Sequence, residues 1–359
     1  MSRLIELGWD DVWDTQFQAM ALEGETPARV SLEHNHVFRV LDAEGEHLAE
    51  VSGRIRHEAT SRAEMPAVGD WVIMRPAHAE GARPQIRAVM PRRSVFSRKS
   101  AGRETEEQVV AANIDTVFLV SGLDQDFNAR RIERYLVMAR QSGAQPVIVL
   151  NKADLPVHVN RVIAEIAAIA PNVPVHAVTA KGPSVDCSAL SAYLSAGRTV
   201  ALLGSSGVGK STIINTLAGN DLLKTAAVRD SDGRGRHTSV HRHLILLDTG
   251  GVVIDTPGMR EIQLWDAAEA VVESFPEIDA KAADCRFRDC RHDTEPGCAV
   301  KAAVADGTVD ASRYESFIKL QKERDAFAIR QEERGHIEQK RQGKVLGKAL
   351  KAMQKDRGR

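Results

Sequence analysis

Short runs of apolar residues, separated by polar and turn residues, characterise the chain from residue 28 to about residue 90. The clearest runs lie at residues 37–41, 48–51, 71–74 and 85–89. Runs of this length indicate β-strands, and about five short strands in such a stretch fit an oligonucleotide-binding (OB) barrel or an SH3-like barrel. Residues 1–27 place apolar and aromatic side chains at mixed spacing, which indicates a short helix or a packed arm.

Strands and helices are expected to alternate after residue 101. Alternation of buried strands with helical segments predicts a mostly parallel sheet covered by helices. The expected strands lie at residues 116–120, 146–150, 175–178 and 200–203, and the expected helices lie at residues 129–141 and 162–170. Residues 243–247 and 252–254 flank a short turn sequence, Asp248-Thr249-Gly250-Gly251, which predicts a hairpin that adds an antiparallel strand.

These patterns divide the chain into five segments. They are an N-terminal arm (residues 1–27), a β-barrel (28–100), an α/β domain (101–270), a helical domain with clustered cysteines (271–338) and a basic tail (339–359). Residues 91–103 are basic and polar, and we expect them to link the barrel to the α/β domain.

The composition is that of a globular protein, with 43% hydrophobic and 27% charged residues in a chain of 359. No run approaches the roughly 18 apolar residues of a membrane span, and the acidic start lacks the pattern of a signal peptide. We therefore expect a cytoplasmic protein without a membrane partner, and nothing in the sequence demands more than a monomer. The formal net charge is −1, but the tail holds eight basic residues and one acidic residue, which suggests a polyanionic partner.

A glycine-rich loop follows the strand expected at residues 200–203. Its sequence is that of a phosphate loop, Gly204-Ser205-Ser206-Gly207-Val208-Gly209-Lys210-Ser211, and a helical segment begins at Thr212. The glycines let backbone N–H groups approach phosphate oxygens, Lys210 neutralises the β and γ oxygens, and the Ser211 hydroxyl can ligate Mg²⁺. A chance glycine-rich turn is the alternative, and the flanking strand and helix argue against it.

The sequence Asn151-Lys152-Ala153-Asp154 ends another expected strand and favours guanine over adenine. The Asp154 carboxylate can accept hydrogen bonds from N1–H and the 2-amino group of guanine, whereas adenine does not present this pair of donors. Lys152 can lie over the base, and Asn151 can join this loop to the phosphate loop. After the next strand, Thr179-Ala180-Lys181 fits a loop whose Ala180 N–H would contact guanine O6.

The order of these motifs is permuted. In ordinary GTPases the phosphate loop comes first, and Asn-Lys-x-Asp follows Asp-x-x-Gly. Here Asn151 precedes the phosphate loop, and Asp255-Thr256-Pro257-Gly258 comes last. The sequence therefore predicts a circularly permuted phosphate-loop GTPase domain, in which Asp255 holds Mg²⁺ through a water molecule and the Gly258 N–H meets the γ-phosphate.

A polar, glycine-rich segment at residues 228–239 carries the expected switch residues. Thr238 is the candidate for the hydroxyl that senses Mg²⁺ and the γ-phosphate, with Ser239 as the alternative. Met259 stands where Ras-like proteins carry the glutamine that orients the attacking water, and a thioether cannot do this. We therefore expect slow hydrolysis by the protein alone. His237 is the candidate for positioning the water, and a solvated loop histidine is the alternative.

Three of the four cysteines cluster with a histidine, as Cys285, Cys290, His292 and Cys298. Three thiolates and one imidazole are the donor set of a closed, structural zinc site. Clustering of this kind in a chain expected in the cytoplasm favours metal over disulfides. A reduced thiol cluster and a redox switch are the alternatives.

Taken together, these features resemble the ribosome small-subunit-dependent GTPases, the RsgA or YjeQ family. The residues that carry the resemblance are the permuted motif order, Gly235-Arg236-His237-Thr238, Asp255-Thr256-Pro257-Gly258, the Cys₃His cluster, Val68-Gly69-Asp70-Trp71-Val72 and Ala112-Asn113-Ile114-Asp115. The resemblance covers roughly residues 28–330. Ser239 departs from the family, in which a second threonine is usual.

The resemblance implies an N-terminal OB barrel, a circularly permuted GTPase domain and a C-terminal helical zinc-binding domain. It implies binding to the small (30S) ribosomal subunit and its 16S rRNA late in subunit maturation. GTP hydrolysis would be stimulated by the subunit and coupled to release. The alternative function is an RNA-binding module with GTP as a mainly structural or regulatory ligand, and a thiol-based redox sensor is a third.

The motifs and the resemblance together define the expected site residues. GTP or GDP is expected at Asn151, Lys152, Asp154, Ala180, Lys181, Gly204, Ser205, Ser206, Gly207, Val208, Gly209, Lys210, Ser211, Thr212, Asp255 and Gly258. Catalysis is assigned to His237, Lys210 and Thr238. Mg²⁺ is expected at Ser211, Thr238 and Asp255, and one structural Zn²⁺ at Cys285, Cys290, His292 and Cys298.

Overall fold

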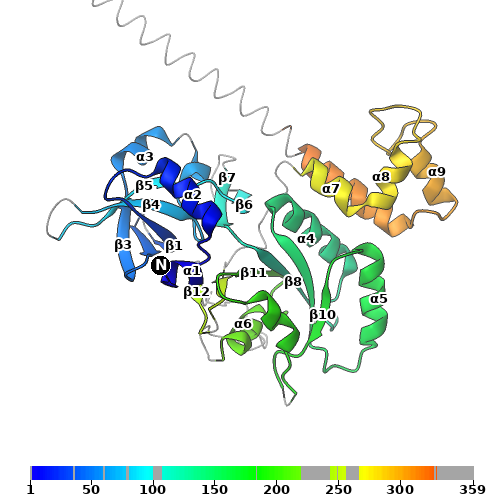
Figure 1. Ribbon diagram of the computed structural model, residues 1–359. Coiled ribbons are helices and arrows are strands. Elements are labelled where there is room, and N and C mark those ends of the chain that lie inside the picture. The colour runs from blue at the N-terminus through cyan, green and yellow to red at the C-terminus, as the bar shows by residue number, and fades with distance from the viewer. Residues whose placement is uncertain are drawn as a thin grey trace, which may run out of the picture. The chain divides into compact units, whose positions relative to one another are not determined.

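A computed structural model describes residues 2–34, 37–59, 61–77, 81–99, 107–182, 184–219, 243–248, 250–255, 267–326 and 329. The chain divides into two units (Figure 1). The first comprises Met1–Lys99 and Glu106–Gln263, and the second comprises Ser100–Thr105 and Leu264–Arg359. Among the described residues, no helix has the length and apolar character needed to cross a bilayer.

The expected N-terminal arm consists of two helices, α1 (Ser2–Glu6) and α2 (Asp11–Met20). The Asp10 side chain caps α2 by accepting hydrogen bonds from the backbone N–H groups of Val12 and Trp13. The Trp9 ring lies edge-on to the ring of Trp71, with centroids 4.7 Å apart. Since Trp71 begins a barrel strand, the arm packs on the barrel.

Five strands close into the expected barrel, in the order β1-β2-β3-β5-β4. They are β1 (Thr26–His34), β2 (Val37–Leu41), β3 (Glu46–Val51), β4 (Trp71–Arg75) and β5 (Gln85–Val89). The pairing of β3 with β5 is parallel, and helix α3 (Gly53–Glu58) and the 3₁₀ turn η1 (Arg62–Glu64) lie between β3 and β4. The strand order 1-2-3-5-4, closed by the parallel pairing of β3 with β5, is that of an OB barrel rather than an SH3-like barrel.

The sequence pattern identified four of these strands and missed β1. Ala28 and Val30 of β1 are buried in the barrel core, but Arg29 stands between them and interrupts the apolar run. The segment expected as a plain linker, residues 91–103, also differs from the expectation. It contains β6 (Val95–Lys99), which pairs antiparallel with β7 (Glu107–Ala112).

The α/β part of the first unit is built on a six-stranded sheet in the order β10-β9-β8-β11-β13-β12. These strands are β8 (Thr116–Gly122), β9 (Gln145–Asn151), β10 (Val175–Val178), β11 (Thr199–Gly204), β12 (His243–Leu246) and β13 (Val252–Asp255). All neighbours are parallel except β12 and β13, which form the expected antiparallel hairpin. Five parallel strands therefore end at one edge of the sheet.

Helices cover both faces of this sheet. Helix α6 (Lys210–Ala218) and the 3₁₀ helix η2 (Ser188–Tyr193) pack on one face, where Ile213 and Leu190 join a cluster with Phe118 and Leu202. Figure 1 shows α4 (Ala129–Ser142) and α5 (Val159–Ile169) on the other side of the sheet from α6.

A buried arginine joins the parts of the first unit. The Arg29 guanidinium donates hydrogen bonds to the backbone oxygens of Leu7 in the arm, Gly69 in the barrel (3.2 Å) and Asn113 before β8 (2.9 Å). Burial lowers the pKa of Arg29 to about 10, so the group stays charged near neutral pH. Gly69 has φ +92°, and a Cβ there would lie 2.1 Å from the Ala112 oxygen and 2.9 Å from Cδ1 of Ile254 in β13.

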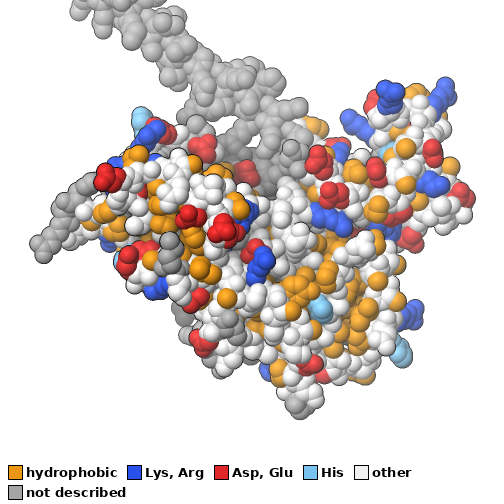
Figure 2. All heavy atoms as spheres, viewed as in Figure 1, with side chains coloured by type: hydrophobic (Ala, Val, Ile, Leu, Met, Phe, Trp, Pro, Cys, Tyr) orange, Lys and Arg blue, Asp and Glu red, His pale blue; other side chains and the backbone are white. Residues whose placement is uncertain are grey.

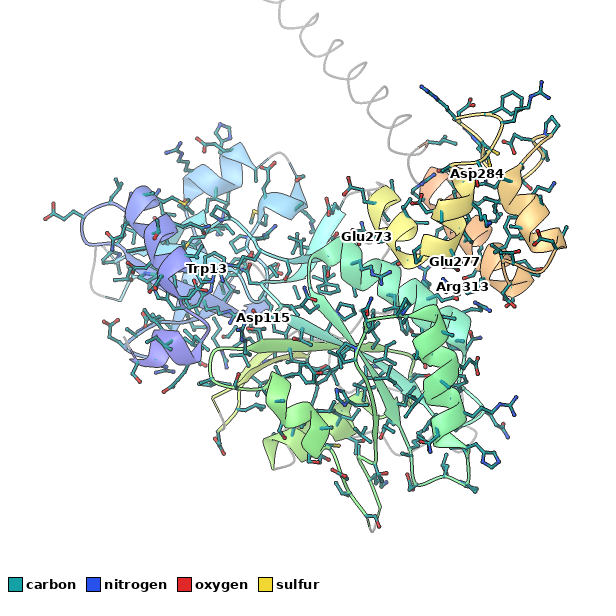
Figure 3. The ribbon with its side chains drawn as sticks, turned by 45° about the vertical axis from the view of Figure 1, so that its right-hand side comes forward. Trp13, Asp115, Glu273, Glu277, Asp284 and Arg313 are labelled. Atoms are coloured by element: carbon teal, nitrogen blue, oxygen red, sulfur yellow. The ribbon has the colours of Figure 1, made fainter. Side chains whose placement is uncertain are left out.

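The second unit is helical around the cysteine cluster. Its helices are α7 (Ala268–Ser274), α8 (Pro276–Ala282) and α9 (Ala299–Ala305), and residues 311–326 are also helical. Figure 2 shows side chains of both charge signs on the visible face of this unit. In its core the Arg313 guanidinium lies over the Phe275 ring and pairs with Glu277. Arg313 and Glu277 are labelled in Figure 3.

Candidate functional site

The phosphate loop lies between β11 and α6, as the sequence predicts. Gly209 caps the start of α6 in a left-handed conformation, with φ +98°, and Gly207 has φ +79°. The Lys210 ammonium donates hydrogen bonds to the backbone oxygens of Gly204 (2.8 Å) and Ser205 (2.6 Å). The first N–H groups of α6 lack helical acceptors, so the loop and helix start together present donors suited to phosphate oxygens.

Asn151 connects three of the predicted motifs. Its side-chain nitrogen donates to the backbone oxygen of Val208 in the phosphate loop (2.8 Å), and its side-chain oxygen accepts from the Ala180 N–H (3.1 Å). The Asn151 side chain is buried. A Cβ on Gly209 would lie 2.2 Å from Asn151 Nδ2, so this position requires glycine. The predicted contact between the Asn-Lys-x-Asp loop and the phosphate loop is thus present, together with one to the Ala180 loop.

The residues predicted to read the base lie at the same edge of the sheet. Asp154 and Lys181 are exposed, and the Asp154 carboxylate approaches Gly182, where a Cβ would lie 3.9 Å from its oxygen. Thr216 of α6 donates a hydrogen bond to the Ala180 oxygen (3.2 Å), which holds the Ala180 loop against the helix of the phosphate loop. An exposed carboxylate beside a fixed backbone loop is suited to selecting a ligand that presents neighbouring N–H donors.

Asp255 ends β13 at this edge, next to the phosphate loop. Burial raises the pKa of Asp255 above its ordinary value, and the charge of Lys210 acts in the opposite direction. Ser211 and Thr212 form the first turn of α6. A serine hydroxyl and an aspartate carboxylate, as at Ser211 and Asp255, are ligand types that a hard cation such as Mg²⁺ prefers.

Several predicted residues cannot be placed in this site. His237, Thr238, Ser239, Gly258 and Met259 lie outside the described residues, as does the basic tail at 339–359. Their assigned roles therefore stay predictions from the sequence.

Three charged residues that the sequence pattern did not single out contact the predicted motifs. Asp124 accepts a hydrogen bond from the Lys152 ammonium, and Asp126 accepts hydrogen bonds from Arg131 and from the Ser205 hydroxyl. Asp124 and Asp126 lie between β8 and α4, and Arg131 lies in the first turn of α4. Two aspartates directly after an expected parallel strand were a usable signal, because that position lies at the ligand-binding edge of the sheet.

The four predicted zinc ligands converge in the second unit. The Cys285 and Cys298 sulfur atoms each lie 3.5 Å from His292 Nδ1 and 3.9 Å from one another, and all four donor atoms, Cys290 included, lie within 4.8 Å of one another. A tetrahedral zinc site with ordinary bond lengths requires edges of about 3.8 Å between sulfurs and about 3.5 Å from sulfur to nitrogen. The cluster therefore fits a metal ion of this size.

The surrounding chain holds the cluster in place. His292 has φ +62°, a left-handed conformation that is uncommon for a residue with a side chain. The Glu295 carboxylate accepts hydrogen bonds from the N–H groups of Arg291, Asp293 and Thr294 and closes the loop around His292. The His292 backbone oxygen accepts a hydrogen bond from the Tyr314 hydroxyl (2.5 Å). The loop is thus shaped so that Nδ1 faces the sulfurs.

Comparison with known proteins gives a consistent result. The RsgA GTPase family model matches residues 89–265. Over 336 residues the chain is 51% identical to the small ribosomal subunit biogenesis GTPase RsgA of Opitutus terrae, with 91% of each chain covered.

Solved structures agree with the fold. The crystal structure of YjeQ from Thermotoga maritima is similar with a TM-score of 0.60 and 28% identity, covering 82% of this chain and 97% of that one. YloQ, described as a circularly permuted GTPase, has a TM-score of 0.58 at 22% identity, covering 84% and 95%, and supports the fold alone. The permuted motif order, the barrel, the cysteine cluster and the extent of the sequence match agree, and this chain belongs to the RsgA GTPase family.

Proposed function

We propose that this protein hydrolyses GTP and acts in the biogenesis of the small ribosomal subunit. The observation that carries the proposal is the Asn151 side chain, which brings the guanine-type loop, the Ala180 loop and the phosphate loop together at one sheet edge. The ribosomal part is supported by relatives named small ribosomal subunit biogenesis GTPases, such as that of Syntrophotalea carbinolica, 39% identical over 362 residues. The binding partner would be the 30S subunit with its 16S rRNA, met in the cytoplasm by a monomer.

In this proposal the guanine base is read by Asp154, with Lys152 over its face and the Ala180 N–H at O6. Lys181 belongs to the same loop as Ala180 and would also contact the nucleotide. The phosphates lie against the backbone of residues 204–209, and Lys210 neutralises the β and γ oxygens. Ser211 and Thr238 would ligate Mg²⁺, and Asp255 would hold it through a water molecule. Thr212 would contact the nucleotide. Bound Mg²⁺ would supply charge neutralisation at the β and γ oxygens.

Hydrolysis requires a group that positions the attacking water, and Met259 cannot be that group. We assign this role to His237, whose imidazole can accept a proton or a hydrogen bond from water. The Gly258 N–H would contact the γ-phosphate. Because Met259 replaces the glutamine of Ras-like proteins, GTP turnover by the protein alone should be slow. The ribosomal subunit would complete the catalytic site. GTP hydrolysis would then be coupled to release of the protein from the ribosomal subunit.

In the second unit, Cys285, Cys290, His292 and Cys298 would hold one zinc ion. The donor set leaves no open position for a substrate, and the cluster therefore serves structure rather than catalysis. Bound Zn²⁺ would cross-link the loop of residues 285–298 to helix α9, which begins directly after Cys298.

The decisive experiment is GTP turnover by the purified protein alone, with 30S subunits and with 50S subunits, at fixed Mg²⁺ and salt. We expect a rise of at least about tenfold that is specific to 30S subunits. GTP binding without any stimulated turnover would favour the alternative that Met259 suggests, an RNA-binding module in which GTP is a structural or regulatory ligand.

His237→Ala tests the catalytic assignment, and His241→Ala is the matched control in the same segment. We expect His237→Ala to retain GTP affinity and lose stimulated turnover, while His241→Ala keeps both. A normal stimulated rate in His237→Ala would transfer the role to another group.

Removal of residues 339–359 should weaken binding to 30S subunits and flatten its salt dependence if the tail contacts phosphates.

A further inference from the structure

The residues that connect β8 to α4, together with the first turn of α4, contact both ends of the nucleotide site. We call residues 124–131 the bridging segment. It is anchored where it begins, because the N–H of Leu123 donates to the backbone oxygen of Asn151 at the end of β9 (2.8 Å). The Asp124 carboxylate lies close to the last residue of β8, since a Cβ on Gly122 would lie 2.9 Å from its Oδ1.

At the base end, Asp124 holds the lysine of Asn-Lys-x-Asp. One carboxylate oxygen of Asp124 accepts from the Lys152 ammonium (2.5 Å), and the other accepts from the backbone N–H of Asp126 (3.0 Å). Lys152 has φ +66°, so its backbone is fixed in an uncommon conformation, and Asp124 fixes the end of its side chain. The Lys152 ammonium also holds the pKa of Asp124 below its ordinary value, which keeps the carboxylate ionised.

At the phosphate end, Asp126 and Arg131 hold the phosphate loop. The Asp126 carboxylate accepts hydrogen bonds from Arg131 (2.7 Å) and from the Ser205 hydroxyl, and Arg131 also contacts that hydroxyl (3.1 Å). The Asn128 side chain caps α4 by accepting from the Arg131 N–H (3.0 Å), which fixes where Arg131 stands. Ser205 in turn provides one of the two backbone oxygens that hold the Lys210 ammonium.

These contacts form one chain from Lys152 to Ser205. The Asp124 carboxylate accepts hydrogen bonds from the Lys152 ammonium and from the backbone N–H of Asp126. The Asp126 carboxylate in turn accepts one from the Ser205 hydroxyl. We propose that Asp124, Asp126 and Arg131 are positioning residues for the guanine nucleotide, which set the phosphate loop relative to the base-binding loop. They act through Lys152 and Ser205, and the inference rests on the proposed nucleotide-binding function.

An ordinary surface ion pair would not position one ligand-binding loop relative to another. Asp126 and Arg131 are partly exposed, and exposed pairs contribute little to folding. The effect proposed here is on the ligand, because misplacement of a binding group by even one ångström weakens contacts that require alignment. Nucleotide affinity should therefore respond more strongly than folding stability.

The first test measures the dissociation constant and dissociation rate of fluorescent GDP for Arg131→Gln, Arg131→Lys and Asp126→Ala. We expect Arg131→Gln and Asp126→Ala to weaken GDP binding by about threefold to tenfold, mostly through faster dissociation. Arg131→Lys keeps a cationic donor and should recover most of the affinity. Glu58→Gln, which neutralises an exposed ion pair of the barrel, is the matched control and should leave GDP affinity unchanged.

The second test asks whether the segment links the two ends. Asp124→Ala releases the backbone of Asp126 and should already loosen the contact with Ser205. Ser205→Ala should therefore weaken GDP binding by about threefold in the wild-type background and by much less in Asp124→Ala. An equal loss in both backgrounds would overturn the linkage, and wild-type affinity in Arg131→Gln and Asp126→Ala would overturn the whole inference.

The outcomes separate this inference from the proposed function. If wild-type protein and Glu58→Gln bind GDP and the segment variants bind it equally well, the positioning role is wrong and the proposed function stands. If the wild-type protein fails to bind guanine nucleotides, both are wrong. Melting of the nucleotide-free variants monitors folding, and a loss of affinity that follows a large drop in melting temperature, with no recovery in Arg131→Lys, would contradict positioning.

Discussion

The nucleotide site and the cysteine cluster differ in how far apart their residues lie in the sequence. Asn151 and Val208 are 57 residues apart, and they meet because parallel strands bring their carboxyl ends to one edge. The four cysteine-cluster donors lie between residues 285 and 298, in a loop followed by a seven-residue helix. The first site depends on a large folded core, whereas the second depends on a local turn and, in our proposal, on its metal ion.

This difference predicts that each site fails in a different way. Loss of one contact in the nucleotide site leaves the sheet beneath it intact, because strands such as β8 and β11 are buried on both faces. Loss of one cysteine removes a ligand on which a small unit depends, since small domains bury too little apolar surface to be stable without a staple. The four predictions below test this comparison, from the largest expected effect to the smallest.

Cys298→Ser should abolish tight zinc binding and unfold the second unit, while the first unit keeps binding GDP. Structural zinc contributes on the order of 10 kcal/mol to small zinc domains, so the loss exceeds what this unit can supply from its core. Zinc content and hydrogen exchange, resolved by unit, would measure this. Cys187→Ser is the control, because Cys187 is buried in the first unit. If the backbone amides of α9 stayed fully protected from hydrogen exchange in Cys298→Ser, zinc would not be what stabilises the second unit.

Gly209→Ala should weaken GDP binding by about a hundredfold or more and destabilise the first unit by about 2–4 kcal/mol. The added methyl group would lie 2.2 Å from Asn151 Nδ2 at a residue with φ +98°. Gly219→Ala is the matched control, because Gly219 also has positive φ (+70°) but no heavy atom within 4 Å of the added Cβ. Calorimetric titration with GDP and urea unfolding would separate the two effects. Similar losses in both variants would mean that the Asn151 contact is unimportant.

Asp154→Asn should shift the preference from guanosine to xanthosine diphosphate by about tenfold or more, without changing stability. The amide supplies a donor where xanthine presents a carbonyl group, and Asp154 is exposed, so folding does not depend on it. Competition between the two nucleotides measures the preference. Asp186→Asn, in the loop after β10, is the control for a lost negative charge. An unchanged preference in Asp154→Asn would reject the base assignment.

Asp255→Asn should raise the melting temperature of the nucleotide-free protein at pH 7 by about 1–3 °C and weaken Mg²⁺-dependent GTP binding. Burial raises the pKa of Asp255, so its ionised form costs stability above that pKa and the cost disappears as the pH falls. The gain should therefore shrink toward pH 4. Glu58→Gln controls for removal of a negative charge, and a gain that persists at low pH would contradict burial as the cause.

Much of the fold could be predicted from the positions and lengths of the apolar runs. The α/β strands and helices were expected close to their observed bounds, because parallel strands form apolar runs that stand out between polar turns. The pattern failed where a charged residue is buried. Arg29 can be buried in β1 because its guanidinium donates hydrogen bonds to backbone oxygens from three distant segments, and no residue near Arg29 in the sequence indicates those partners.

Strand β6 was missed for a related reason. Its partner β7 is separated from it by residues 100–106, and a basic, polar segment gives no sign that it pairs. Antiparallel pairing of this kind satisfies the backbone whatever the side chains are, so composition alone does not reveal it.

By itself, the sequence determined the permuted order of the motifs and the kinds of side chain that each candidate site contains. Phosphate binding needs glycines and a lysine in consecutive positions, and zinc binding needs donors closely spaced in one loop, so both are visible in the linear order. Only the tertiary structure decided which residues support them. The Asp126 contact with Ser205 joins residues 79 apart, and the Arg29 contact with Asn113 joins residues 84 apart. Such contacts depend on strand order and on the paths of the connecting segments, which the spacing of residues does not encode.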